Sequence, residues 1–191
     1  MTTDPATETH RAVFFDRDGT LIESVHYLNR PEQVRLIDGA ANVLRECQQL
    51  GYLNVIVTNQ AAIGKGLLTP EGLVEIQAEL ERQLADSNAR IDAWYYCPLV
   101  RTVSSREVVE HPDRKPGPGM LLRAAREHAI DLRRSFMVGD MISDTLAGWN
   151  AGCAANILVG GESELASHPS VDYRIETLEE LPALLRLRQA G

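Results

Sequence analysis

Residues 12–20 read AVFFDRDGT, an apolar run that passes directly into two aspartates, Asp16 and Asp18. A short apolar run bounded by turn residues is typical of a strand that is buried on both faces of a parallel sheet. Two carboxylates this close repel each other, so the pairing is costly unless a cation lies beside it. The stretch therefore predicts a buried strand that ends at an ion-binding turn.

Outward from this stretch, short apolar segments alternate with amphipathic ones. Strands are predicted over residues 12–16, 53–59, 91–97, 135–140, 154–159 and 172–175. Helices are predicted over residues 38–50, 69–88, 117–129, 145–151 and 178–187. Alternation of this kind predicts a parallel sheet with helices on both faces. The predicted fold class is α/β, a three-layer sandwich around a central Rossmann-like parallel sheet.

Composition and charge limit the partners. The chain has 191 residues, of which 44% are hydrophobic and 24% charged, and this fits one globular domain, predicted over residues 11–191. The net charge of −8 argues against a nucleic-acid partner, because phosphate backbones bind basic surfaces. No apolar run is long enough to span a bilayer, so no membrane partner is expected. No oligomer interface is evident, so we expect a monomer.

The cysteines and the first residues bear on location. Cys47, Cys97 and Cys153 are widely spaced and odd in number, which argues against a disulfide framework and predicts a reducing, cytoplasmic location. Residues 1–10 lack the basic start and apolar core of a signal peptide, and we expect them to form a disordered tail.

Polar residues gather where the predicted strands end. They are Asp16 and Asp18, then Thr58, Asn59 and Gln60, then Arg114 and Lys115 before a helix, and finally Gly139, Asp140 and Asp144. In parallel α/β sheets, ligands bind outside the carboxyl ends of the strands. We therefore expect these groups, distant in sequence, to meet at one edge of the sheet.

The types of these residues suggest metal-assisted phosphoryl transfer. Asp16, Asp140 and Asp144 are hard oxygen donors of the kind that Mg²⁺ prefers, and a divalent cation would also hold a phosphate oxygen. Asp16 is then a candidate nucleophile that forms an aspartyl-phosphate. Asp18 is a candidate general acid that protonates the leaving alcohol and afterwards deprotonates water.

Four further residues fit this chemistry. Thr58 and Asn59 can donate hydrogen bonds to phosphoryl oxygens, and Lys115 can supply positive charge to the transition state. Gly19 allows the backbone to turn sharply beside the metal. Each motif alone has a simpler reading, as a turn, a strand-ending cap, a helix start or an N-cap. Their common position at strand ends favours a catalytic site.

The order DRDGT (16–20), TNQ (58–60), RKP (114–116) and GDMISD (139–144) resembles the haloacid dehalogenase superfamily of phosphotransferases over nearly the whole chain. Within it, the segments FFDRDGTLI, HYLNRPEQVRLIDGA, VTNQAAIGKG, YYCP and RKPGPGML resemble the subfamily of heptose bisphosphate and histidinol phosphatases. This resemblance implies that the side chains of Asp16 and Asp140 and the backbone carbonyl of Asp18 hold Mg²⁺. Asp144 is the fourth candidate ligand.

The resemblance also implies substrate contacts. Thr58 and Lys115 would stabilise the phosphoryl group, and Arg114 would help to recognise the substrate. The other candidates for substrate binding are Gly19, Thr20, Asn59 and Gln60. For the second phosphate of a bisphosphate, the candidates are Arg114 and Lys65.

Superfamily members often carry a separate cap domain over the site. Here only residues 21–36 lie between the first strand and the next helix, so we expect no cap domain and an open site whose loops select the substrate. Ile22 replaces an Asn and Met141 replaces a Lys that many relatives have near the substrate. These departures leave the identity of the sugar open.

Relatives usually fold the loop over residues 95–116 around zinc, with a Cys-x-His pair and a Cys-x-Cys pair. Here Cys97 is followed by Leu99, and His111 and Asp113 stand where two cysteines are usual. A closed structural site needs four good ligands, so no zinc is expected. We expect Cys97 to be a small buried hydrophobe, and the loop to be packed by four valines, Val100, Val103, Val108 and Val109.

The leading hypothesis is a Mg²⁺-dependent phosphomonoesterase that acts on a small phosphorylated sugar. The resemblance favours removal of the 7-phosphate of D-glycero-D-manno-heptose 1,7-bisphosphate. The alternative is a phosphatase of histidinol phosphate or another small metabolite. A different class is a non-catalytic phosphate-binding or phospho-acceptor protein, but such a protein needs no acid/base group at Asp18.

Overall fold

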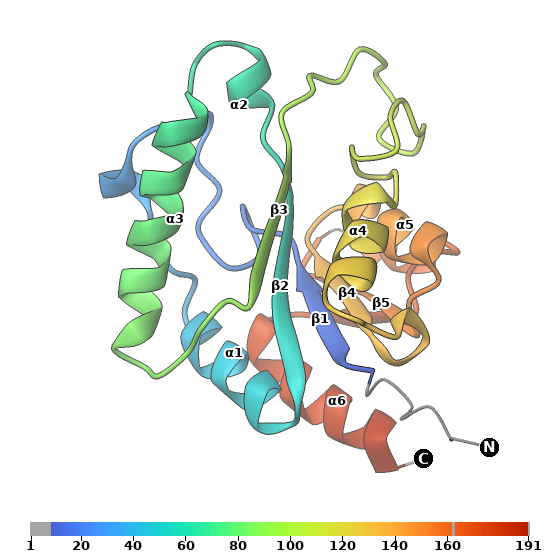
Figure 1. The fold of residues 1–191 in the computed structure, drawn as a ribbon. Helices are drawn as coiled ribbons and strands as arrows, with labels where there is room; N and C mark the ends of the chain where they lie inside the picture. Colours follow the sequence, from blue (N-terminus) through green and yellow to red (C-terminus); the bar gives the residue numbers. More distant parts are fainter. Residues whose placement is uncertain (1–8, 162, 191) are drawn as a thin grey trace, which may run out of the picture.

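Six parallel strands form the centre of the computed structural model, which describes residues 9–161 and 163–190 (Figure 1). The strands are β1 (Arg11–Phe15), β2 (Tyr52–Asn59), β3 (Ala93–Cys97), β4 (Phe136–Gly139), β5 (Ala155–Val159) and β6 (Tyr173–Ile175). Their order is β3-β2-β1-β4-β5-β6, and every neighbouring pair is parallel. The chain therefore reverses its direction of sheet growth at β1, and such a switch point is where α/β sheets bind ligands.

Helices cover both faces of this sheet (Figure 1). Those on one face are α1 (Ala40–Gln49), α3 (Pro70–Ala85) and α6 (Leu181–Ala190), and those on the other are α4 (Gly119–Glu127) and α5 (Ile142–Ala151). A short helix, α2 (Ala61–Gly64), follows β2. Four 3₁₀ helices complete the described elements, at Pro31–Gln33, Leu132–Arg134, Ser163–Ser167 and Leu178–Glu180. The predicted three-layer α/β sandwich is confirmed.

Strand β1 shows why the apolar run decides the fold. Val13 and Phe15 pack into the core beneath α1, α3 and α6, while Ala12 and Phe14 pack into the core beneath α4 and α5. None of these four side chains is exposed, as period-two alternation in a doubly covered strand requires. The next residue, Asp16, donates its backbone N–H to Val138 O at 2.9 Å, which fixes the first aspartate at the middle of the sheet edge.

The segment after β1 is short. In the described part of the chain, residues 16–39 contain one helical turn, Pro31–Gln33, and no separate cap domain. Of the tail predicted over residues 1–10, residues 1–8 lie outside the described residues, and His10 already forms a parallel bridge with Ile130. None of the described helices has both the length and the apolar character needed to cross a membrane.

The loop over residues 98–116 differs from expectation. Its four valines were expected to pack it onto the domain, but they are between 37% and 50% exposed. Polar contacts hold the loop instead: Thr102 donates from its N–H to Glu110 Oε1 at 2.8 Å, and Arg114 Nη1 donates to Leu99 O at 2.7 Å. The valines stay exposed because the loop lies beyond the helices that cover the sheet (Figure 1). Cys97, at its start, is buried as predicted.

Candidate active site

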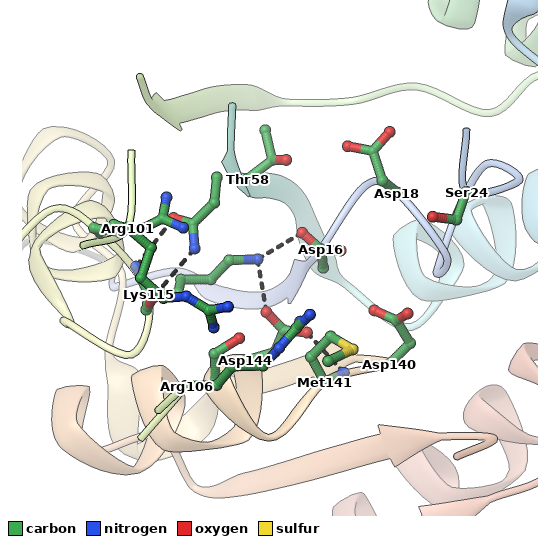
Figure 2. Close-up of a pocket in the computed structure, with 13 residues that line it drawn as sticks. Asp16, Asp18, Ser24, Thr58, Arg101, Arg106, Lys115, Asp140, Met141 and Asp144 are labelled. Carbon is green, nitrogen blue, oxygen red and sulfur yellow. Dashed lines mark hydrogen bonds and ion pairs between the residues drawn. The ribbon is translucent and has the colours of Figure 1, made fainter. Parts of the chain in front are cut away.

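The carboxyl ends of β1, β2 and β4 surround a cavity of about 340 Å³ (Figure 2). Four carboxylates line it, those of Asp16, Asp18, Asp140 and Asp144. Four cationic side chains line it too, from three arginines and Lys115, although the chain as a whole has a net charge of −8. The structure thus brings together charged residues from distant segments, and it concentrates cations where an anion could bind.

Lys115 is the most constrained of these cations. It is 4% exposed, and its Nζ lies 2.5 Å from Asp16 Oδ1 and 2.8 Å from Asp144 Oδ1 (Figure 2). Nζ also donates to Val57 O at 2.8 Å, so all three of its hydrogens have partners. Burial lowers the pKa of Lys115, but Asp144 and Asp16 outweigh this effect and the pKa is raised overall. Lys115 is therefore a fixed positive charge beside Asp16.

The positive charge of Lys115 does not fully compensate the negative charges of the neighbouring carboxylates. Burial raises the pKa of Asp16, Lys115 opposes this, and the neighbouring carboxylates raise the pKa further. Burial and then Asp144 raise the pKa of Asp140 to about 6. Asp140 Oδ1 is also buried without a hydrogen-bond partner among the described residues. An added cation would stabilise the ionised form of each acid.

The donor set suits magnesium. One carboxylate oxygen from each of Asp16, Asp140 and Asp144 lies within 4.8 Å of the other two. Both oxygens of Asp144 are already engaged, because Oδ1 binds Lys115 and Oδ2 accepts a hydrogen bond from Met141 N at 3.0 Å. Asp16 and Asp140 are thus the side chains best able to hold Mg²⁺, and Asp144 orients the lysine.

Gly19 allows Asp140 to come close to the turn after β1. Its φ is +88°, and a Cβ built on it would lie 2.4 Å from Asp140 Oδ2. Both the left-handed backbone and the close approach require glycine. Gly19 does not line the cavity between the aspartates and Lys115, and its contact there is with Asp140, so we expect it to position this acid.

A Gly19→Ala variant should therefore lose more than backbone stability. We expect a higher Mg²⁺ requirement for activity, because Asp140 must move, in addition to ~1–2 kcal/mol of strain from the left-handed backbone. Gly152→Ala is a matched control, since Gly152 has a φ of +83° and open space where its Cβ would lie. Thermal unfolding and Mg²⁺ titration of activity would measure both effects. Equal Mg²⁺ requirements in the two variants would contradict the role given to Gly19.

Asp18 is held by two donors from its own side of the site. Its Oδ2 accepts from Arg17 Nη2 at 2.9 Å and from Gln60 Nε2 at 2.9 Å. Gln60 Nε2 donates also to Thr58 Oγ1 at 2.9 Å, which leaves the Thr58 hydroxyl hydrogen free for another acceptor. Arg17 is only 1% exposed, and the sequence interpretation overlooked it. The only sequence signal for it is its position between the two aspartates of the DRDGT motif.

The predicted substrate-binding residues divide into two groups. Arg114 and Asn59 line the cavity, but the Asn59 amide holds the backbone of Lys115, accepting from its N–H and donating to its C=O, both at 3.1 Å. Thr20 is fully buried, and Gln60 donates to protein groups, so Thr20, Gln60 and Gly19 lie outside the cavity lining. Gln60 instead holds Asp18 and Thr58, and Gly19 lies against Asp140.

The structure adds four cavity residues that were not among the predicted site residues. Ser24, Arg101 and Arg106 lie outside the four motifs, and Ser143 lies within GDMISD. Met141, which departs from the usual lysine, lines the cavity as expected. Lys65 does not, because its Nζ contacts the hydroxyl and the ring of Tyr27. Arg114 is thus the better placed of the two cations considered for a second phosphate.

The residues that remain of the zinc pattern have other partners. Burial raises the pKa of the Cys97 thiol, which disfavours the thiolate that zinc needs. His111 Nδ1 accepts from Asp113 N at 3.1 Å, and the Asp113 carboxylate pairs with Arg123 at 3.2 Å. Absence of zinc stays a prediction, and these contacts are consistent with it.

Comparisons with known proteins agree with this site. The "HAD-hyrolase-like" family model matches residues 113–181. The chain is 36% identical over 179 residues to the D-glycero-beta-D-manno-heptose-1,7-bisphosphate 7-phosphatase of Pasteurella multocida, covering 92% of this chain and 97% of that protein. It is 33% identical over 181 residues to the Escherichia coli K12 protein of the same name, with coverages of 93% and 95%.

One solved structure is similar to this chain over nearly the full length of both proteins. It is D,D-heptose 1,7-bisphosphate phosphatase from B. bronchiseptica, complexed with magnesium and phosphate. The TM-score is 0.79 at 27% identity, with 95% of this chain and 99% of that chain covered. The similarity therefore extends over nearly all of both chains.

Proposed function

The chain belongs to the haloacid dehalogenase-like phosphatases and is a phosphoric monoester hydrolase, and from this premise we propose a substrate and a mechanism. The proposed reaction removes the 7-phosphate of D-glycero-D-manno-heptose 1,7-bisphosphate, depends on Mg²⁺ and passes through an aspartyl-phosphate on Asp16. The names of the relatives support the substrate. The observation that carries the mechanism is the buried Asp16–Lys115 pair beside Asp140, in a cavity large enough for a small ligand.

In the first step, a carboxylate oxygen of Asp16 forms a bond to phosphorus while the bond from phosphorus to the sugar oxygen breaks. Lys115 holds Asp16 Oδ1 and so fixes the orientation of the nucleophile. Asp18 gives its proton to the leaving sugar alkoxide. The free hydroxyl hydrogen of Thr58 donates to a phosphoryl oxygen.

In the second step, Asp18 takes a proton from water as the water oxygen attacks phosphorus, and the bond from Asp16 to phosphorus breaks to release inorganic phosphate. Arg17 and Gln60 keep the Asp18 carboxylate in one position for both transfers. Magnesium held by Asp16 and Asp140 would neutralise charge on the phosphoryl oxygens.

Asp18→Asn should keep the fold and the metal but lose proton transfer. We expect kcat to fall by ~10²–10⁴-fold on a sugar phosphate, the usual contribution of a positioned acid or base. The rate of the first step should fall less with p-nitrophenyl phosphate than with a sugar phosphate, because nitrophenolate leaves without being protonated. Rapid-mixing measurement of nitrophenol release would show this difference. Unchanged kcat on the sugar phosphate would exclude Asp18 as the acid.

Chelation should abolish activity and added Mg²⁺ should restore it. Because burial raises the pKa of Asp140 to about 6, a proton competes with Mg²⁺ for this carboxylate as the pH falls through that value. Asp16, whose pKa is also raised, should act in the same direction. Calorimetric titration should show weaker Mg²⁺ binding at about pH 5 than at about pH 8. Equal affinity at both values would contradict the ligand assignment.

A panel of substrates tests the proposed function. We expect the highest kcat/KM with heptose 1,7-bisphosphate, tried as both anomers, and release of the 7-phosphate as identified by NMR of the product. Faster hydrolysis of histidinol phosphate would favour that alternative. A stable phosphorylated Asp16 with no phosphate release would indicate a phospho-acceptor instead.

A further inference from the structure

Two arginines of the loop over residues 98–116 extend into the cavity. Arg101 and Arg106 line it together with Arg114, and all three come from this one loop (Figure 2). Neither Arg101 nor Arg106 belongs to any of the sequence motifs. With Arg114 and Lys115 they bring the cationic side chains at the cavity to four, equal to the number of carboxylates there, in a chain whose net charge is −8.

Among the described residues, no carboxylate forms an ion pair with any of these three guanidinium groups. Within residues 9–161 and 163–190, seven other arginines pair with carboxylates. No such pair forms at Arg101, Arg106 or Arg114, and Arg114 Nε is buried without any hydrogen-bond partner. The acid of the same loop, Glu110, is engaged by Thr102 and Val103.

The three cations also repel one another. Burial lowers the pKa of the Arg114 guanidinium, and the charges of Arg101 and Arg106 lower it further, while Cys97 and Glu110 act in the opposite direction. An anion bound between the three groups would relieve this repulsion and supply the missing acceptor. The planar fork of arginine suits two oxygens of one phosphate.

The proposed mechanism assigns the reacting phosphate to Asp16, Thr58 and Lys115 and gives the loop arginines no part in the reaction at phosphorus. The three hydrogens of Lys115 Nζ already have partners at Asp16, Asp144 and Val57. The unpaired arginines are therefore available to a second anionic group of the same ligand.

We propose that Arg101 and Arg106 complete, with Arg114, a subsite for the second phosphate of a bisphosphorylated sugar. This subsite rests on the proposed function. It assigns the selection of a bisphosphate over a monophosphate to the loop over residues 98–116. Contacts remote from the reacting phosphorus bind substrate and transition state alike, so their loss should appear mainly in KM.

The test is an Arg101→Ala/Arg106→Ala double variant, measured with Mg²⁺ on matched substrate pairs. One pair is heptose 1,7-bisphosphate and heptose 7-phosphate, and the other is fructose 1,6-bisphosphate and fructose 6-phosphate. The control is Arg90→Ala/Arg133→Ala, which removes the same charge from two exposed arginines outside the cavity. Placing lysine instead of alanine at position 106 of the double variant (Arg106→Lys) keeps the positive charge but not the planar, forked guanidinium group. It should restore part of the activity that the double variant loses on the bisphosphate.

We expect the double variant to lose ~10–100-fold in kcat/KM on the bisphosphate, mostly through KM, and several-fold less on the monophosphate, as charged hydrogen bonds of ordinary strength imply. The control variant should resemble the wild type. Equal losses on both members of a pair, or no loss, would overturn the subsite while the proposed function stands. If wild-type protein ignores the heptose bisphosphate, the proposed function fails. The fructose pair then decides the subsite: a preference for the bisphosphate that the double variant loses supports it, and the absence of any preference overturns it.

Discussion

An Asp16→Asn variant is expected to lose turnover by on the order of 10⁴-fold or more, because an amide is a poor nucleophile and a weaker metal ligand than a carboxylate. The substitution changes little in shape, and Lys115 keeps Asp144 as an ionic partner at 2.8 Å. The protein should therefore remain folded. Release of inorganic phosphate from the sugar bisphosphate, with circular dichroism as the test of folding, measures both properties.

The matched control for this variant is Asp86→Asn, at an exposed aspartate that ends α3 outside the cavity. It should keep the activity of the wild type. Acid-quenched protein after brief incubation with substrate should carry phosphate on the wild-type chain and not on the Asp16 variant. Substantial phosphate release by the Asp16 variant would exclude the covalent mechanism.

A Lys115→Met variant is expected to lose both activity and stability. Removing the ammonium leaves Asp16 and Asp144 buried together with no cation, and breaking a buried ion pair in this way typically costs ~3–5 kcal/mol. The loss should be largest at neutral pH. It should shrink as the pH falls, because a carboxyl whose pKa is raised in the folded protein takes up a proton more readily than in the unfolded chain. Urea unfolding at several pH values measures this.

A second variant separates the two losses. In Lys115→Met/Asp144→Asn, one of the two buried charges is removed together with the lysine, so much of the stability should return. Activity should stay absent, because Asp16 still lacks its positive neighbour. A Lys115→Met protein as stable as the wild type would contradict the buried network.

Much of the site could be predicted because its residues follow strands. The apolar run at 12–15 fixes β1 in the sheet centre, and the carboxyl ends of parallel strands must share one edge, so Asp16, Asp140 and Thr58 meet there. Lys115 follows no strand, and it was expected at this edge because it directly precedes a predicted helix. The observed ends of the helices and strands differ from the predicted ends by a few residues. The four-residue α2 was not predicted, because it is too short to show a periodic pattern.

Side-chain direction within turns could not be predicted. The sequence DRDGT does not predict that the Arg17 side chain is buried. It also does not predict that Thr20 is buried outside the lining of the cavity. An asparagine such as Asn59 can bind either a phosphate or a neighbouring backbone, and only the tertiary approach of Lys115 decides. The monomeric state, the cytoplasmic location and the absence of zinc or nucleic acid stay predictions.

The backbone around Lys115 is clamped from two sides, independently of the loop that leads to it. Asn59 binds the amide groups of Lys115, and Asn150 Nδ2 from α5 donates to Pro116 O at 2.9 Å. Because of this clamp, the position of the catalytic lysine does not depend on the loop that selects the substrate, and the loop can be exchanged. A transplanted loop of different length or charge between residues 99 and 113 would change which phosphate ester is accepted, while the lysine stays beside its aspartate. Substitutions in this exposed segment could therefore alter substrate selection without displacing the lysine from Asp16.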